Sequence, residues 1–138
     1  MADKIIAGKP TQLPACIVPV PLHWSRQLSR GFNQSTLLAA QVRARLLRHY
    51  KLGRRELPIA DRLLRRRLRT LSQVTQDIDG RQGNVRDAFE LRSSVQVPSS
   101  VAIVDDVVTT GATVNEIAHL LKRAGVGRVE VWAAARTP

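Results

Sequence analysis

The strongest constraint on the fold is the order of apolar and polar segments between residues 101 and 135. A continuous apolar run, Val101–Val104, is followed by a polar segment that contains Gly111. Apolar residues then recur at helical spacing as far as Gly125, and a second apolar strand is expected at Arg128–Ala135. A strand, a helix and a second strand in this order form a βαβ unit. The chain is therefore predicted to be an α/β protein with a parallel sheet.

The ends of the predicted helix carry their own signals. Thr113 and Glu116 match the capping-box pattern T-x-x-E, which places the start of the helix there. Gly125 stands where a left-handed residue commonly ends a helix. The loop between the strand and the helix is accordingly expected over Asp105–Ala112.

The first two thirds of the chain are less regular. A buried strand is expected at Ala15–Val20 and a helix at about 34–50, with Asn33 or Ser35 as its N-cap. Leu57–Leu64 is a weaker strand candidate. Residues 65–97 are interpreted as a flexible excursion with one short hairpin around Ala88–Leu91. The whole chain, 1–138, is predicted to be one domain, with residues 1–14 as a flexible lead-in.

Composition excludes several classes of protein. The chain has 138 residues and 43% hydrophobic content, enough for one aliphatic core. No apolar run approaches the roughly 20 residues of a membrane span, and residues 1–14 lack the apolar core of a secretory signal. Cys16 is the single cysteine, so an internal disulfide framework and a thiolate zinc cluster are excluded. These features predict a cytoplasmic protein.

Positive charge is concentrated in one stretch. The formal net charge is +11, and the segment Arg43–Arg69 contains eleven Lys or Arg residues against two acids, Glu56 and Asp61. A block of this kind indicates an anionic partner, either a polyphosphate ligand or a nucleic acid. The competing interpretation is an arginine-rich surface that is simply solvated.

The residue types after the 101–104 strand define a ligand chemistry. Asp105 and Asp106 are expected at the carboxyl end of a buried strand, where open α/β sheets bind ligands, and paired carboxylates can accept hydrogen bonds from two vicinal hydroxyls. The segment Thr109–Thr113 leads into a helix N-terminus, where backbone N–H groups and the helix dipole favour a phosphate. Gly111 allows close approach of the backbone. The pattern therefore predicts a site for a ribose 5-phosphate.

Two other nucleotide-binding patterns are excluded. An acidic strand end also occurs in P-loop proteins, but the sequence has no G-x-x-x-x-G-K-[ST]; its one Gly-Lys pair, Gly8–Lys9, precedes a proline. The dinucleotide pattern G-x-G-x-x-G is also missing. Taken singly, an Asp pair or a Thr-Gly is ordinary turn chemistry. The prediction depends on their order and spacing.

The run V-A-I-V-D-D-V-V-T-T-G-A-T at 101–113 resembles the phosphoribosyl-pyrophosphate (PRPP) signature of the type I phosphoribosyltransferase superfamily. The resemblance extends over about residues 15–137 and is most specific for the competence protein F branch (ComF/GntX-like). The further matching motifs are Pro19–His23, Arg30–Gln34, Leu37–Ala39, Thr70 with Gln73, Arg81 with Asn84, and Ala88–Phe89. Members of this branch usually begin with a cysteine-rich zinc ribbon. The given sequence does not include one, so it is either a short member or a fragment of a longer protein.

The resemblance implies a fold and a set of roles. The fold would be a Rossmann-like parallel sheet with flanking helices and a flexible hood at 65–97. Asp105 and Asp106 would hold the ribose hydroxyls, with Asp105 also in or near the Mg²⁺ shell. Hood cations would assist the departing pyrophosphate, and Arg66 is the candidate catalytic one. The 5′-phosphate would be bound by Thr109, Thr110, Gly111, Ala112 and Thr113, and the pyrophosphate would face Val20, Pro21, Leu22 and His23; the further candidate cations are Arg65, Arg67, Arg69, Arg30 and Arg81.

The implied activity is Mg²⁺-dependent transfer of phosphoribosyl from PRPP to an unidentified nucleobase or amine, with release of pyrophosphate. Purine-salvage relatives carry an acid at the position of Thr109, and its absence here argues against a 6-oxopurine acceptor. Two alternatives stay open. One is a regulator with the PRPP fold and no turnover, and the other is a protein of DNA uptake that binds nucleic acid through Arg43–Arg69. The resemblance also implies a homodimer.

Overall fold

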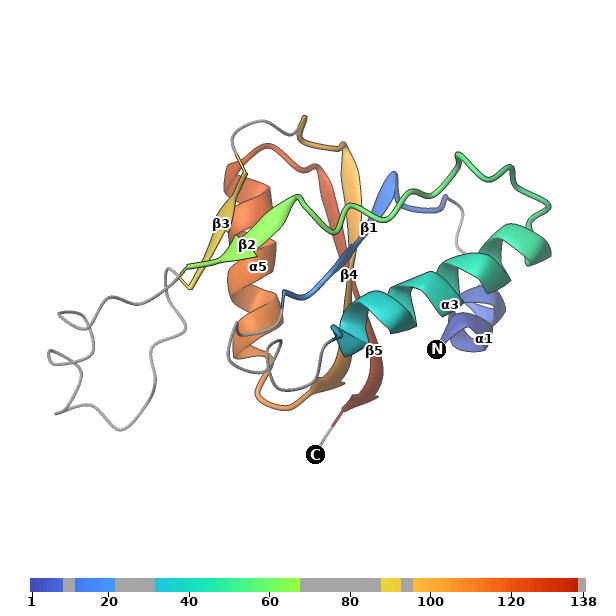
Figure 1. Ribbon diagram of the computed structural model, residues 1–138, viewed down its shortest axis with the longest axis horizontal. Helices are drawn as coiled ribbons and strands as arrows, with labels where there is room; N and C mark the ends of the chain where they lie inside the picture. The colour runs from blue at the N-terminus through green and yellow to red at the C-terminus, as the bar shows by residue number, and fades with distance from the viewer. Residues whose placement is uncertain (9–11, 22–31, 68–87, 93–95, 137–138) are drawn as a thin grey trace, which may run out of the picture.

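The computed structural model describes residues 1–8, 12–21, 32–67, 88–92 and 96–136 (Figure 1). Its centre is a parallel sheet with the strand order β1-β4-β5. These strands are β1 (Cys16–Pro19), β4 (Ser100–Val108) and β5 (Arg128–Arg136). The α/β class and the parallel sheet expected from the sequence are confirmed.

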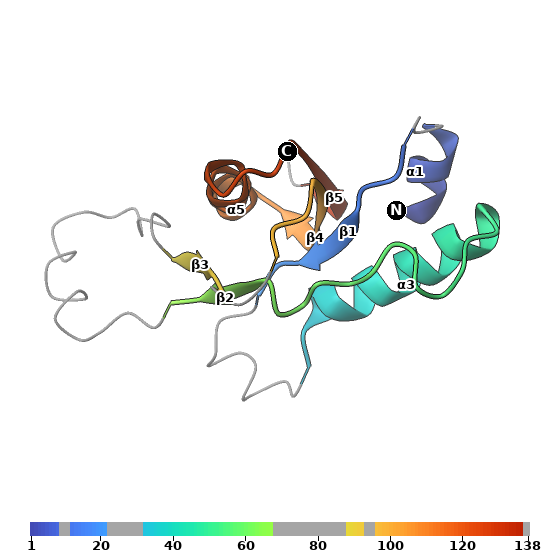
Figure 2. The same ribbon diagram turned by 90° about the horizontal axis from the view of Figure 1, so that it is seen from above.

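Helices cover both faces of this sheet (Figure 2). Helix α3 (Gln34–His49) packs on one face and α5 (Ala112–Arg123) on the other. Alternate residues of β4 point into the two layers: Ala102 and Val104 lie in the α3 layer, whereas Val101 and Ile103 lie in the α5 layer. All four are fully buried, which explains why the strand reads as one continuous apolar run.

Helix α3 begins where the sequence predicts it. Asn33 is its N-cap, because the Asn33 side chain accepts a hydrogen bond from the Ser35 N–H. Its inward face buries Ala39, Val42 and Leu46. The expected lead-in at residues 1–14 contains a short helix, α1 (Ala2–Ala7), whose first residue is buried in the same layer.

The start of α5 corrects the sequence prediction. The N-cap is Gly111, in the left-handed conformation at φ 79°, and no side chain caps the helix. The predicted capping box of Thr113 and Glu116 is therefore wrong. Glu116 instead accepts a hydrogen bond from the Ala88 N–H at 2.8 Å, a tertiary contact that local spacing does not reveal. The left-handed Gly125 at the far end, with φ 100°, agrees with the prediction.

Strand β4 is longer than expected, because it continues to Val108. Asp105 and Asp106 thus lie within the strand and not in the loop predicted at 105–112.

A second, antiparallel sheet consists of β2 (Leu64–Arg66) and β3 (Phe89–Leu91). The strand expected at 57–64 is wrong in extent, since Ile59 forms only an isolated bridge with Ile17 and the strand starts at Leu64. The connection over 68–87 lies outside the described residues. Within the described part of the chain, no helix has the length and apolar character needed to cross a membrane.

Candidate functional site

A concave hollow lies at the carboxyl end of β4, where the strand leads into α5. It is open to solvent, and its empty volume, open solvent included, is about 220 Å³. The position is the edge at which parallel α/β sheets bind their ligands. The residues that line it are Asp105, Val107, Val108, Thr109, Thr110, Gly111, Ala112, Thr113 and Val114. The structure therefore brings one of the two predicted carboxylates together with all five residues of the predicted phosphate turn.

Asp105 is half-buried, and two hydrogen bonds hold one of its oxygens. Its Oδ1 accepts from the Asp106 N–H at 3.0 Å and from the Ser35 hydroxyl at 3.3 Å. Burial raises the pKa of the Asp105 carboxyl above its usual range, and the nearby Asp106 charge adds to this, while the bonds from the Asp106 N–H and Ser35 oppose it. Raised carboxylate pKa values of this origin are common at functional sites.

Asp106 is placed differently from its neighbour. Asp106 does not line the hollow, although its side chain interacts with the Asp105 carboxyl and adds to the rise of the pKa of that group. Its Oδ1 accepts from the Val107 N–H at 2.8 Å. The expectation that both aspartates face one ligand therefore has geometric support at Asp105 alone.

The turn before α5 is built to expose backbone N–H groups. Gly111 takes a left-handed conformation that other residues rarely adopt, and this turns the chain from β4 into the helix. The first N–H groups of any helix have no partner inside the helix, and the helix dipole places partial positive charge there. One of them is covered, because the Ala112 N–H donates to the Thr110 hydroxyl at 3.3 Å. The hydroxyls of Thr109 and Thr110 are exposed at the rim.

The other predicted site residues are only partly described. Val20 is buried at the end of β1, and its carbonyl oxygen accepts a hydrogen bond from Asn33 at 3.0 Å. Pro21 follows it, half-buried. Leu22 and His23 lie outside the described residues, as do Arg30, Arg69 and Arg81.

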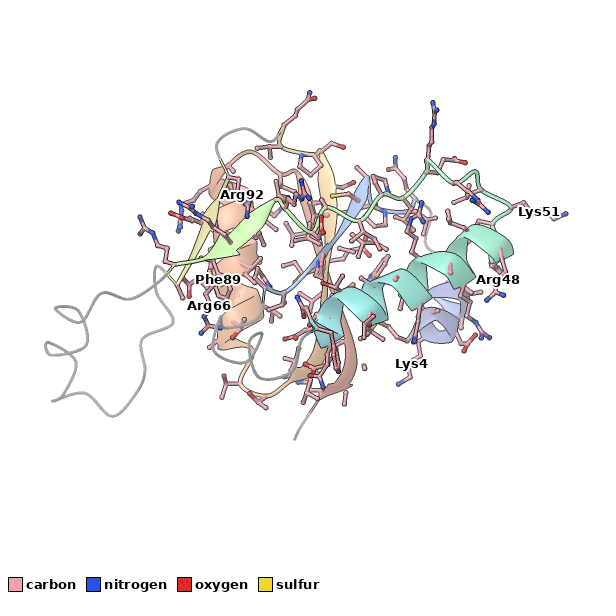
Figure 3. The ribbon with its side chains drawn as sticks, viewed as in Figure 1. Lys4, Arg48, Lys51, Arg66, Phe89 and Arg92 are labelled. Carbon is pink, nitrogen blue, oxygen red and sulfur yellow. The ribbon has the colours of Figure 1, made fainter. Side chains whose placement is uncertain are left out.

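The described hood cations do not reach the hollow. Arg66 is on β2, with its guanidinium 5.3 Å from the centre of the Phe89 ring (Figure 3). Arg65 and Arg67 form ion pairs with Glu90 on β3. A catalytic role for Arg66 would need a different arrangement of this hairpin and stays a prediction.

Sequence reasoning missed two residues that contact the site. Ser35, which is only 3% exposed, donates to Asp105, and Asn33 donates to the carbonyl of Val20. Both belong to the start of α3, more than 70 residues before the turn. The sequence signal that could have pointed to them was the family motif Arg30–Gln34, which includes Asn33. The motif did not indicate which residues Asn33 or Ser35 would contact.

The residues present fit a magnesium ion that arrives with its ligand. Mg²⁺ is commonly bound by one or two carboxylates together with phosphate oxygens of the substrate. The described residues contain no cluster of three or more metal-ligating side chains. Asp105 offers Oδ2, which neither of the two donors to Oδ1 reaches, as a single carboxylate oxygen.

Comparison with known proteins assigns the chain to a family. Residues 35–138 match the family described as phosphoribosyl transferase domain. Since this match covers more than half of the sequence, and the parallel sheet, the acidic strand end and the glycine turn are the expected core, the chain belongs to the type I phosphoribosyltransferase family. Its relatives place it in the competence protein F branch.

The relatives share close to the whole of this chain. Competence protein F of Haemophilus influenzae is 39% identical over 127 residues, which are 91% of this chain and 52% of the relative. The DNA utilization protein YhgH of Escherichia coli K12 is 42% identical, over 91% of this chain and 51% of its own length. Competence protein ComFC of Streptococcus pneumoniae is 30% identical, over 86% and 47%. The chain thus spans about half the length of these relatives. No solved structure matches it significantly.

Proposed function

We propose that this chain binds PRPP together with Mg²⁺ and transfers the phosphoribosyl group to a nucleobase or amine, with release of pyrophosphate. One observation carries the proposal. Asp105 and the Thr109–Thr113 turn line the same hollow. A carboxylate that can accept a hydrogen bond from a sugar hydroxyl therefore lies close to a helix N-terminus of the kind that favours phosphate. The family and the signature at 101–113 support the same ligand.

Different residues of the hollow bind different parts of the ligand. The turn and the N-terminus of α5 hold the 5′-phosphate through backbone N–H groups and hydroxyls. The carboxylate of Asp105 accepts a hydrogen bond from a ribose hydroxyl and so fixes the sugar ring relative to that phosphate. Together they set the direction in which C1 faces its acceptor, which is the positioning that a two-substrate transfer requires.

The transfer itself exchanges one bond at C1 for another. The bond from C1 to pyrophosphate breaks, and its electron pair leaves with the pyrophosphate. A lone pair on the acceptor nitrogen forms the new bond, and that nitrogen loses its proton to water. Mg²⁺, when bound, supplies neutralisation of the leaving polyanion.

Calorimetry with PRPP and Mg²⁺ tests the binding step. We expect the wild-type chain to bind and Asp105→Asn to bind at least tenfold more weakly, because the amide loses the charged acceptor. Asp61→Asn is the matched control: it removes the same charge from an exposed loop and should leave the affinity unchanged. Equal affinity of the wild type and Asp105→Asn, or no binding to either, would contradict the proposal.

Turnover is a separate question from binding. Release of pyrophosphate is measured with a panel of nucleobases and amines, and an acceptor-dependent release identifies an enzyme. Binding of PRPP without release across the panel would instead favour a regulator that uses the same hollow.

A second function is favoured by the surface charge and by the relatives. Proteins named for competence and for DNA utilization match nearly the whole chain. At the C-terminal end of α3, a cluster of exposed cations has no carboxylate partner among the described residues; we name it the distal basic cluster, and it consists of Arg48, Lys51, Arg54 and Arg55. We propose that this cluster binds nucleic acid through phosphate contacts. Binding to a labelled oligonucleotide that weakens as salt rises tests it.

A further inference from the structure

Three elements of the site meet at the start of α3. The Asn33 side chain donates from Nδ2 to the Val20 carbonyl oxygen and accepts at Oδ1 from the Ser35 N–H, both at 3.0 Å. The Ser35 hydroxyl in turn donates to Asp105. Two adjacent polar side chains therefore join the end of β1, the first turn of α3 and the acidic end of β4.

This junction lies where β1 has ended but β4 and β5 continue. The pairing of β1 with β4 stops with Pro19 beside Val104, after which the Val20 N–H donates to the Val104 carbonyl. Asp105 is the next residue of β4, and in the described chain it pairs with Ala133 of β5 but with no residue on the β1 side. Near that end of β1, the Ser35 hydroxyl donates to the Asp105 side chain.

The two carboxylate oxygens of Asp105 differ in their hydrogen bonds. Both recorded donors, the Ser35 hydroxyl and the Asp106 N–H, reach Oδ1. Neither of these two donors reaches Oδ2. The terminal torsion of an aspartate is otherwise broad, so two donors on one oxygen restrict how the carboxylate turns and leave the second oxygen for a ligand.

We propose that Ser35, supported by Asn33, is a positioning residue that orients the Asp105 carboxylate so that its free oxygen accepts a ribose hydroxyl. This inference rests on the proposed function, since it names how that site recognises its sugar. It also relates Asn33 to the site: the N-cap of α3 accepts from the backbone N–H of the serine that orients the carboxylate.

A purely structural role for Ser35 predicts different behaviour. A buried hydroxyl requires a hydrogen-bond partner, and Asp105 supplies one whether or not a sugar ever binds. In that case, removal of the hydroxyl lowers stability and weakens all ligands equally. A positioning role affects only ligands whose hydroxyls meet Asp105.

The test compares two ligands that share the phosphate cradle. Ribose 5-phosphate occupies both parts of the hollow, whereas inorganic phosphate occupies the turn alone. We expect Ser35→Ala to weaken ribose 5-phosphate by about fivefold, the ratio that corresponds to one ordinary hydrogen bond, and to leave inorganic phosphate unchanged. Ser35→Thr, which keeps the hydroxyl, should restore the affinity. Ser35→Cys, a weaker donor of similar volume, replaces Ser35→Ala if that variant does not fold.

A double-mutant cycle shows whether Ser35 acts through Asp105. In an Asp105→Ala background, which removes the acceptor of the Ser35 hydroxyl, Ser35→Ala should have little further effect on ribose 5-phosphate. Equal effects of Ser35→Ala in both backgrounds, or equal weakening of ribose 5-phosphate and inorganic phosphate, would overturn the inference and leave the proposed function standing. Failure of the wild type to bind ribose 5-phosphate or PRPP would overturn the proposed function itself, and the inference with it.

Discussion

At the scale of single residues, Asp105 has a carboxyl group that is both partly buried and able to carry a negative charge, and burial disfavours the charge. Its carboxyl is partly withdrawn from water next to a second aspartate, and burial holds its pKa above the usual range. The folded chain therefore keeps the Asp105 proton to a higher pH than the unfolded chain does. Ionisation of this group therefore lowers the free energy of unfolding. This loss of stability is absent at pH values below the usual aspartate pKa, and it reaches its full size at pH values above the raised pKa of the folded chain.

This reasoning predicts that Asp105→Asn stabilises the chain while it weakens binding. The asparagine keeps an acceptor for Ser35 and for the Asp106 N–H but carries no charge. We expect its Tm to exceed that of the wild type at about pH 7.5, and the difference to vanish near about pH 3, where the aspartate is protonated in both states. Thermal unfolding across this range measures it, with Asp61→Asn as the exposed control. A lower Tm for Asp105→Asn at neutral pH would contradict the argument.

At the scale of elements, the success of sequence reasoning depended on whether a pattern was local. The run at 101–104 and the stripe of Val114, Ile117 and Leu121 are set by burial against neighbouring layers, so their periodicity predicted β4 and α5. The capping box failed because Glu116 bonds to the distant Ala88 N–H. The extension of β4 through Asp105 was missed for a similar reason, since pairing with β5 continues beyond the apolar run.

The candidate site divides in the same way. The carboxylate and the glycine turn are eight residues or fewer apart, and their spacing predicted that they share a ligand. The contact of Ser35 with Asp105 joins residues 70 positions apart, and no local pattern encodes such a contact.

Helix α5 provides a matched pair of glycines for a test of the turn. Gly111 before it and Gly125 after it both have positive φ, 79° and 100°. A methyl group at either position meets no severe clash, so the cost of alanine is conformational at both ends, about 1–2 kcal/mol of unfolding free energy. We expect Gly111→Ala and Gly125→Ala to lower stability similarly in denaturant, while only Gly111→Ala weakens inorganic phosphate. Equal phosphate affinity of the two variants would indicate that the turn does not hold phosphate.

At the scale of the whole molecule, charge and site are separated along α3. The helix has 16 residues and so is about 24 Å long. Its N-terminus contacts Asp105, whereas Arg48 and Lys51 project from its opposite end (Figure 3). The loop there is fixed by Arg43, whose guanidinium donates to the carbonyl oxygens of Leu57 at 2.8 Å and Glu56 at 3.3 Å, and also of Arg54. The distal basic cluster is thus held in place and is remote from the hollow.

This separation predicts that nucleic-acid binding and PRPP binding are lost independently. The triple variant Lys51→Gln, Arg54→Gln, Arg55→Gln should reduce affinity for single-stranded DNA and lower the slope of log affinity against log salt by about two, since each lost phosphate contact removes roughly 0.7. Its PRPP affinity should not change. The control removes three exposed arginines elsewhere: Arg92→Gln, Arg123→Gln, Arg136→Gln. Fluorescence anisotropy of labelled single-stranded DNA across a salt series measures the DNA affinity and its salt dependence for both triple variants. If the two triple variants lose DNA affinity equally, the attraction comes from net charge alone, and the distal basic cluster is not a binding surface.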